Sequence, residues 1–190
     1  MSGLRTRLEA AVAELPAGLR DHVLRVVAEA RRLARRYGVD EERAMVAALG
    51  HDLMRGHTAP ELLREAEAAG LAANDVERSQ PILLHGPLSA RLMAERFGVD
   101  DAEALAAARH HTTARAGMSA LERLIYVADK IEPQKAGADP ELIEACRLAD
   151  ESLEAALLRL LDIQIERALE RGWPLHPDTV AARNELLAKS

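Results

Sequence analysis

The sequence predicts an all-α fold, and its composition is the first reason. Ala (37) and Leu (29) are its commonest residues, and both favour helices. Aromatic residues make up only 2% of the chain, so strand-forming residues are scarce. Apolar residues also recur at steps of three and four, which is the period of a helix with one buried face. We expect one helical domain, the usual number for 190 residues.

Stop and start signals divide the chain into helices. A helix is expected at 17–37, where Gly38 ends it, and another from the capping residue Asp40 to Met54. The pattern RYGVDE at 36–41 returns as RFGVDD at 96–101, which predicts a second hairpin with helices from about 87 and up to about 111. Further helices are expected at about 4–14, 60–69, 118–132, 140–147, 150–171 and 177–188.

Charge and cysteine content exclude several classes of protein. The net charge is -6 and basic residues are dispersed, so we expect no nucleic-acid partner. The single Cys146 cannot form an internal disulfide. The apolar runs are far shorter than a membrane span, and the N-terminus lacks the apolar segment of a signal peptide. These features predict a soluble, cytoplasmic protein with no membrane partner.

Polar residues interrupt apolar helical faces at several positions. His22 lies on the stripe of its helix, where a lone histidine is commonly a core residue. His51 and Asp52 end an apolar run, and Asp129 lies four residues after Ile125 on a stripe that should face the core. A buried carboxylate needs a cation, which can be an arginine or a metal ion. The two carboxylates together with histidines favour a metal.

The internal repeat selects further histidines. His110 and His111 are adjacent, and periodicity alone does not decide between them. His51 lies eleven residues after Asp40 and His111 lies eleven after Asp100, so we choose His111. His85 lies close to the position that corresponds to His22 in the second hairpin. Each hairpin then supplies one histidine per helix.

Six residues form the predicted site. Four imidazoles and two carboxylates without a thiolate favour Fe, Mn, Zn, Co or Ni over Ca, as one or two ions. The candidate metal ligands are His22, His51, Asp52, His85, His111 and Asp129.

These residues resemble the HD-domain metal-dependent phosphohydrolases, whose signature is an adjacent His-Asp pair with a preceding His and a later Asp. Over about 19–187 the chain is similar to the bacterial YqeK-like symmetrical bis(5′-nucleosyl)-tetraphosphatases. The motifs that carry this resemblance are LHGP at 84–87, HTT at 111–113, MS at 118–119, AD at 128–129, IEP at 131–133 and HPDTVAARN at 176–184.

The resemblance implies a ligand set and substrate contacts. His22, His51, Asp52 and Asp129 match the ligands of one metal, and Asp52 would bridge it to a second held by His85 and His111. Asp52 and Arg55 would be catalytic. The candidate phosphate-binding residues are Arg55, Thr112, Thr113, Arg115, Lys130 and Lys135. The chain departs from the family pattern at three of its positions, which are Arg55 for Lys, Ala114 for Gly and Lys130 for an aromatic residue.

The resemblance also implies an activity, which is hydrolysis of diadenosine tetraphosphate to two ADP by a divalent transition metal, with iron as the first choice. The chain would be a single HD domain over 1–190, with a metal-binding core at about 19–135 and C-terminal helices at about 139–188 packed on it. A homodimer is compatible with this reading. Tyr126 is the best of few candidates to stack on adenine. Two alternatives remain, a nucleotide-binding regulatory module without turnover and an HD-type diiron oxygenase.

Overall fold

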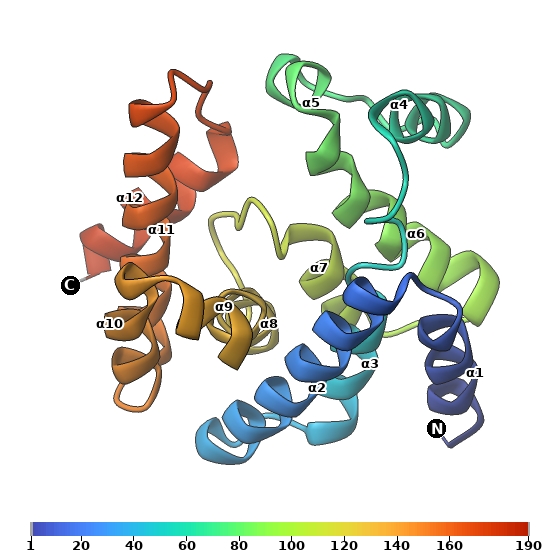
Figure 1. Ribbon diagram of the computed structural model, residues 1–190, viewed down its shortest axis with the longest axis horizontal. Helices are drawn as coiled ribbons and strands as arrows, with labels where there is room; N and C mark the ends of the chain where they lie inside the picture. The colour runs from blue at the N-terminus through green and yellow to red at the C-terminus, as the bar shows by residue number, and fades with distance from the viewer. Residues whose placement is uncertain (1, 190) are drawn as a thin grey trace.

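The computed structural model describes residues 2–189, and every regular element in that range is helical (Figure 1). The all-α prediction is therefore confirmed. No helix between residues 2 and 189 combines the length and the apolar character needed to cross a membrane.

Residues 2–50 form a helical hairpin with an N-terminal helix against it. Helix α1 is Ser2–Ala13, and the hairpin consists of α2 (Ala17–Tyr37) and α3 (Glu41–Gly50). Helix α2 buries residues at steps of three and four, including Val23, Val26 and Ala30. Helix α3 is buried over most of its surface, because α1, α2, α7 and α8 all pack on it.

The middle of the chain supplies the second hairpin. Its long members are α6 (His85–Phe97) and α7 (Ala102–His110), which are followed by α8 (Ala120–Ile131). Helix α8 packs on α2, α3, α7, α10 and α11, and lies in the middle of the view in Figure 1. It is the central element of the fold, so polar residues on it are surrounded by other helices. The shorter elements are α4 (Ala59–Ala68), α5 (Asp75–Ser79) and the 3₁₀ helix η1 (Pro81–Leu84).

The last part of the chain covers α8 from the other side. It consists of α9 (Pro133–Ala138), α10 (Pro140–Ala149), α11 (Leu153–Glu170) and α12 (Pro177–Lys189). Helices α10 and α11 pack on each other and on α8, and α12 packs on α11. In Figure 1 these helices lie on the left and α4 and α5 at the upper right, while α8 lies next to α9 in the lower middle of the view.

The two copies of the sequence repeat end their first helices in the same way, but the N-caps of their second helices differ by one position. Gly38 and Gly98 end α2 and α6 with φ values of 67° and 72°, a left-handed conformation that glycine adopts at low cost. Asp40 caps α3 as predicted, but α7 is capped by Asp101 rather than Asp100. The eleven-residue step that selected His111 therefore starts from a residue that is not the cap.

Other boundaries also differ from the sequence prediction. The predicted helix 40–54 ends at Gly50 and continues as turns. Helix α6 begins at His85, because Pro87 in its first turn needs no N–H partner. The short elements α5, η1 and α9 were not predicted, since four to six residues carry too little periodicity.

The two helices of the second hairpin approach closely at Gly86. A Cβ atom there would lie 2.7 Å from the backbone oxygen of Arg109. Gly86 follows His85, and Arg109 lies two residues before His111. The contact therefore sets how closely the two segments that carry these histidines approach each other.

We expect Gly86→Ala to lower the free energy of unfolding by about 1–3 kcal/mol, because the added methyl meets backbone rather than a movable side chain. Gly18→Ala is the matched control, since Gly18 is also the second residue of its helix but has open space around it. Denaturant unfolding measures both changes. Equal stability of the two variants would contradict this account of the contact.

Candidate metal centre

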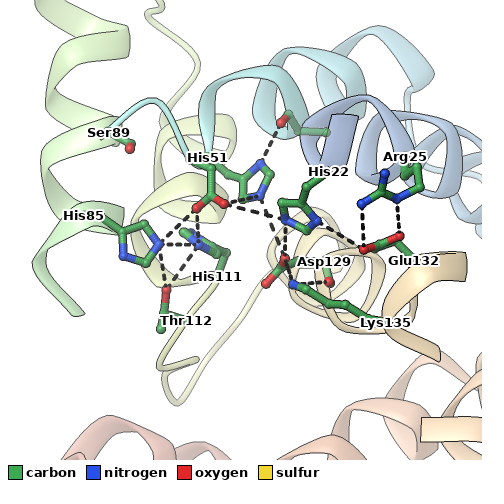
Figure 2. A network of polar contacts seen from close by, with 12 residues as sticks. His22, Arg25, His51, His85, Ser89, His111, Thr112, Asp129, Glu132 and Lys135 are labelled. Carbon is green, nitrogen blue, oxygen red and sulfur yellow. Dashed lines mark hydrogen bonds and ion pairs between the residues drawn. The ribbon is translucent and has the colours of Figure 1, made fainter. Parts of the chain in front are cut away.

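Five helices bring the six candidate ligands together. His22 comes from the middle of α2, and His51 with Asp52 follows the end of α3. His85 starts α6, His111 follows α7, and Asp129 lies near the end of α8. All six side chains are at most 12% exposed. Figure 2 shows that the four histidines and Asp129 point toward one another.

Asp52 divides the cluster into two halves. Its Oδ2 lies 3.6 Å from His22 Nε2 and 3.5 Å from His51 Nε2. Its Oδ1 lies 3.0 Å from His85 Nε2 and 3.3 Å from His111 Nε2. One carboxylate oxygen thus faces each pair of imidazoles, which is an arrangement that a bridging ligand requires.

Asp129 completes the half that contains His22 and His51. Its Oδ1 lies 3.1 Å from His22 Nε2 and 3.9 Å from His51 Nε2. Ligand atoms of His22, His51 and Asp129 lie within 4.8 Å of one another, and so do those of His51, Asp52 and His111. Each of these triads could hold a metal ion.

Backbone carbonyls orient three of the imidazoles. The Nδ1 atoms of His51 and His111 lie 2.7 Å from the carbonyl oxygens of Ala48 and Ala108, and His85 Nδ1 contacts the Ile82 carbonyl. A carbonyl only accepts hydrogen bonds, so each Nδ1 carries the proton and each Nε2 presents a lone pair to the cluster. The same step of three residues recurs because each histidine stands at or next to a helix end.

The fourth imidazole is oriented by Glu132, a carboxylate of the IEP motif to which the sequence alone assigned no role. His22 Nδ1 lies 3.3 Å from Glu132 Oε1, and Glu132 is 1% exposed. Arg25 Nε donates to Glu132 Oε2 at 2.6 Å, and the backbone N–H of Gln134 donates to the same oxygen. Two signals were available, because Glu132 lies three residues after Asp129, just past the end of α8, and is the middle residue of the IEP motif.

The cluster concentrates acceptors and therefore fits a cation. His51 Nε2 and Asp52 Oδ1 are buried and make no hydrogen bond within the described residues. Burial lowers the pKa of His51 and lowers that of His111 to about 4, so both imidazoles are neutral at pH 7. Neutral lone pairs then face carboxylate oxygens, an arrangement that a divalent ion satisfies and a hydrogen bond does not.

Both carboxylates are ionised. Burial works to raise the pKa of Asp52, but contacts with His51, His111 and His85 outweigh it and hold the pKa well below the usual range. Burial has the same effect on Asp129, where the charges of Lys130 and Lys135 outweigh it and lower the pKa. The ligand set is therefore anionic at neutral pH.

Of the six candidate phosphate-binding residues, three lie against the metal ligands and one is exposed nearby. Lys130 and Lys135 each place Nζ 2.7 Å from an Asp129 oxygen, and the Thr112 hydroxyl lies 3.1 Å from His111 Nε2. Arg55 is exposed, in the turn after Asp52.

The other two candidates point elsewhere. Thr113 donates to the carbonyl of Ala114, and Arg115 forms two hydrogen bonds with buried Glu122. Between them, Ala114 has a φ of 57° and is the one non-glycine residue with positive φ among those described. The family pattern that the chain resembles has glycine at this position, and glycine adopts this conformation without strain.

A cleft of about 630 Å³ opens beside the cluster. Thr112, Lys130 and Lys135 line it on the side of the metal centre. Residues of α11 and of the segment before α12 form much of the remaining wall, together with residues of α5, η1, α10 and α12. Tyr126, the predicted stacking residue, does not reach it. The Tyr126 ring is fully buried, and its hydroxyl donates to Gln164, so that prediction was wrong because α8 is enclosed on all sides.

A family model described as HD domain matches residues 19–134. The chain belongs to the HD domain family. The resemblance inferred from the His-Asp pair is thereby confirmed, and the all-α prediction agrees with it.

Relatives of this HD protein carry a more specific name. It is 34% identical to the symmetrical bis(5′-nucleosyl)-tetraphosphatase of Bacillus subtilis, over 89% of each chain. It is 35% identical to the protein of the same name from Halalkalibacterium halodurans, over 87% of each chain. The crystal structure of a predicted HD superfamily hydrolase involved in NAD metabolism from Clostridium acetobutylicum matches with a TM-score of 0.92, 33% identity and 97% coverage of each chain.

We expect Glu132→Gln to weaken metal binding by about 10- to 100-fold, because the carboxylate that orients His22 loses its charge. Glu122→Gln is the matched control, since Glu122 is also a buried carboxylate paired with an arginine, but its hydrogen bonds within residues 2–189 go to Arg115 and Ser119 rather than to a candidate ligand. Competition with a chelator measures the affinity. An equal loss in both variants would mean that Glu132 acts through general stability.

His111→Ala is expected to remove metal from the HD protein, and His110→Ala to leave the metal content unchanged. His111 is 2% exposed within the cluster, whereas His110 is only partly buried and belongs to neither metal-binding triad of the described residues. Elemental analysis of the two purified variants, with circular dichroism to verify folding, checks the expectation. A larger loss in His110→Ala would reverse the assignment.

Proposed function

We propose that this HD protein is a metal-dependent hydrolase that cleaves diadenosine tetraphosphate at its centre and releases two ADP. The observation that carries the proposal is the cluster of imidazole lone pairs and ionised carboxylates beside a cleft lined with lysines. The names of the two relatives, each aligned over more than four fifths of the chain, support the choice of substrate.

The ligand set supports a pair of divalent ions. His22, His51, Asp52 and Asp129 would hold one ion, and Asp52, His85 and His111 would hold the other. Iron is our first choice of metal, with Mn, Co, Ni and Zn as alternatives that the same donors accept. Such ions lower the pKa of water and stabilise charge on attacking and leaving oxygens.

The residues of the chain contribute orientation and positive charge. The Nδ1 hydrogen bonds hold the imidazoles with Nε2 toward the cluster, so the donors need no rearrangement. Lys130 and Lys135 lie against Asp129 and also line the cleft, where they would bind phosphate oxygens. Thr112 would donate its hydroxyl to the same group.

Arg55 would bind a phosphate from the turn after Asp52, where its side chain is exposed. For Thr113 and Arg115 we propose an indirect contribution. Both belong to the loop that follows His111, and the bonds from Arg115 to Glu122 tie this loop to α8. Loss of Arg115 would thus shift the loop that carries Thr112.

The position of Asp52 favours cleavage at the centre of the tetraphosphate. Asp52 stands between the two halves of the ligand set, so the middle of the tetraphosphate would lie over it. The two ADP products then depart with equal charge. Cleavage at an end would instead place one nucleoside beside Asp52.

Hydrolysis of diadenosine tetraphosphate in ¹⁸O-labelled water is expected to give labelled ADP as the only labelled nucleotide. Asp52→Ala is expected to retain the helical fold and lose both metal and turnover, because it removes the carboxylate shared by both halves. Chromatography with mass spectrometry measures the products. Labelled AMP with ATP would contradict symmetrical cleavage, tight binding without products would indicate a regulatory module, and oxygen-dependent turnover of an organophosphonate or a polyol would indicate an oxygenase.

A further inference from the structure

The cleft beside the metal centre is built largely from residues outside the HD family match. That match ends at residue 134, whereas α11 and the 171–176 segment form much of the wall of the cleft. Its volume of about 630 Å³ lies within the usual range of about 300–1,000 Å³ for ligand pockets. The general HD core thus supplies the metal cluster, and the C-terminal helices enclose the adjoining space.

One wall of this cleft carries the only tryptophan of the chain. Trp173 is 50% exposed, although most large apolar side chains of the protein are buried. The Arg171 guanidinium lies 4.8 Å from the centroid of its ring. A half-exposed ring against a pocket offers an apolar face on which a flat base can stack.

The distance between Trp173 and the metal centre leaves room for a phosphate chain. Gln164 donates to the Thr112 carbonyl and accepts from Tyr126, so this part of α11 touches the loop after His111. Arg171 follows Gln164 by seven residues, or about 10 Å along a helix. A nucleoside at Trp173 would therefore leave space for phosphates between it and the metal ligands.

The charge of the cleft is complementary to a phosphate chain. Lys130, Lys135, Arg167 and Arg171 line it, and Asp139 is the one acidic residue of the lining. The two lysines also contact the buried Asp129, and Arg167 pairs with both Asp139 and Glu141. This local excess of positive charge occurs on a protein with a net charge of -6. An anionic ligand is therefore favoured over a neutral or a basic one.

The wall that holds Trp173 is tied to the opposite side. His176 Nε2 lies 3.0 Å from Asn74 Nδ2, and Glu77 Oε1 is 3.8 Å from the same nitrogen. Asn74 caps α5, so these contacts join the start of α12 to α5. The segment with Trp173 is therefore anchored three residues beyond the ring.

We propose that this part of the cleft is a nucleoside subsite in which the Trp173 ring stacks on adenine while Arg171 and Arg167 bind the phosphate side of the nucleotide. The location of the phosphates rests on the proposed function. Base recognition then resides in the C-terminal helices, and phosphate chemistry resides in the HD core.

The fluorescence of Trp173 can be used to test the proposal, since Trp173 is the one tryptophan in the sequence. Titration of the metal-loaded full chain with ADP, adenosine and pyrophosphate is followed by emission, and affinities are checked by calorimetry. ADP and adenosine are expected to quench the emission, and pyrophosphate is not. If the emission does not respond to saturating ADP that calorimetry shows to be bound, the subsite is wrong.

Substitution provides the second arm. Trp173→Ala is expected to weaken ADP binding by about 5- to 150-fold and raise KM for diadenosine tetraphosphate, with affinity for pyrophosphate unchanged. Trp173→Phe should recover part of the loss. Leu169→Ala is the matched control, because Leu169 is 64% exposed near the same end of α11 but does not line the cleft. An unchanged affinity for ADP in Trp173→Ala would overturn the proposal.

The two hypotheses fail in different ways. Symmetrical hydrolysis with no effect of Trp173 on ADP binding would reject the subsite and retain the proposed function. Quenching by ADP and adenosine in a protein that hydrolyses no dinucleotide with any of the candidate metals would retain the subsite and reject the proposed function.

Discussion

The convergence of four imidazole lone pairs on two ionised carboxylates is the constraint on which the rest of this structure depends. His51 and Asp52 lie at its centre, and His51 Nε2 and Asp52 Oδ1 are buried without a hydrogen-bond partner among residues 2–189. Acceptors that face acceptors in a buried space are costly. A divalent cation between these acceptors removes the repulsion. The arrangement that destabilises the metal-free fold is therefore the one that binds the metal.

Helix ends provide the geometry that this cluster needs. His51 and His111 stand just after α3 and α7, and His85 stands at the start of α6, where each ring bonds a carbonyl three residues earlier. Ser89 of α6 accepts the backbone N–H of Met54 and holds the turn after Asp52 against the second hairpin. Backbone bonds of this kind orient a ligand without another buried charge.

The chain also divides its tasks between two regions. The helices up to α8 carry the candidate ligands, and the helices after α9 complete the cleft. Gln164 links the regions through Thr112, so a change in the C-terminal wall acts directly on the loop after His111. With this division, the C-terminal wall of the cleft can change its preference for a bound molecule while the metal-binding residues stay the same.

Local patterns in the sequence determined the helical class, the left-handed stops at Gly38 and Gly98, and the polar residues on apolar faces, because these depend on neighbours within a few positions. The choice of His111 had a weaker basis, since α7 is capped at Asp101 and not at Asp100. Tertiary structure alone decided that Glu132 supports His22, that Tyr126 is enclosed, and that Arg115 pairs with Glu122. Each of these depends on which helices surround α8, and contacts between residues tens of positions apart leave no periodic signal in the chain.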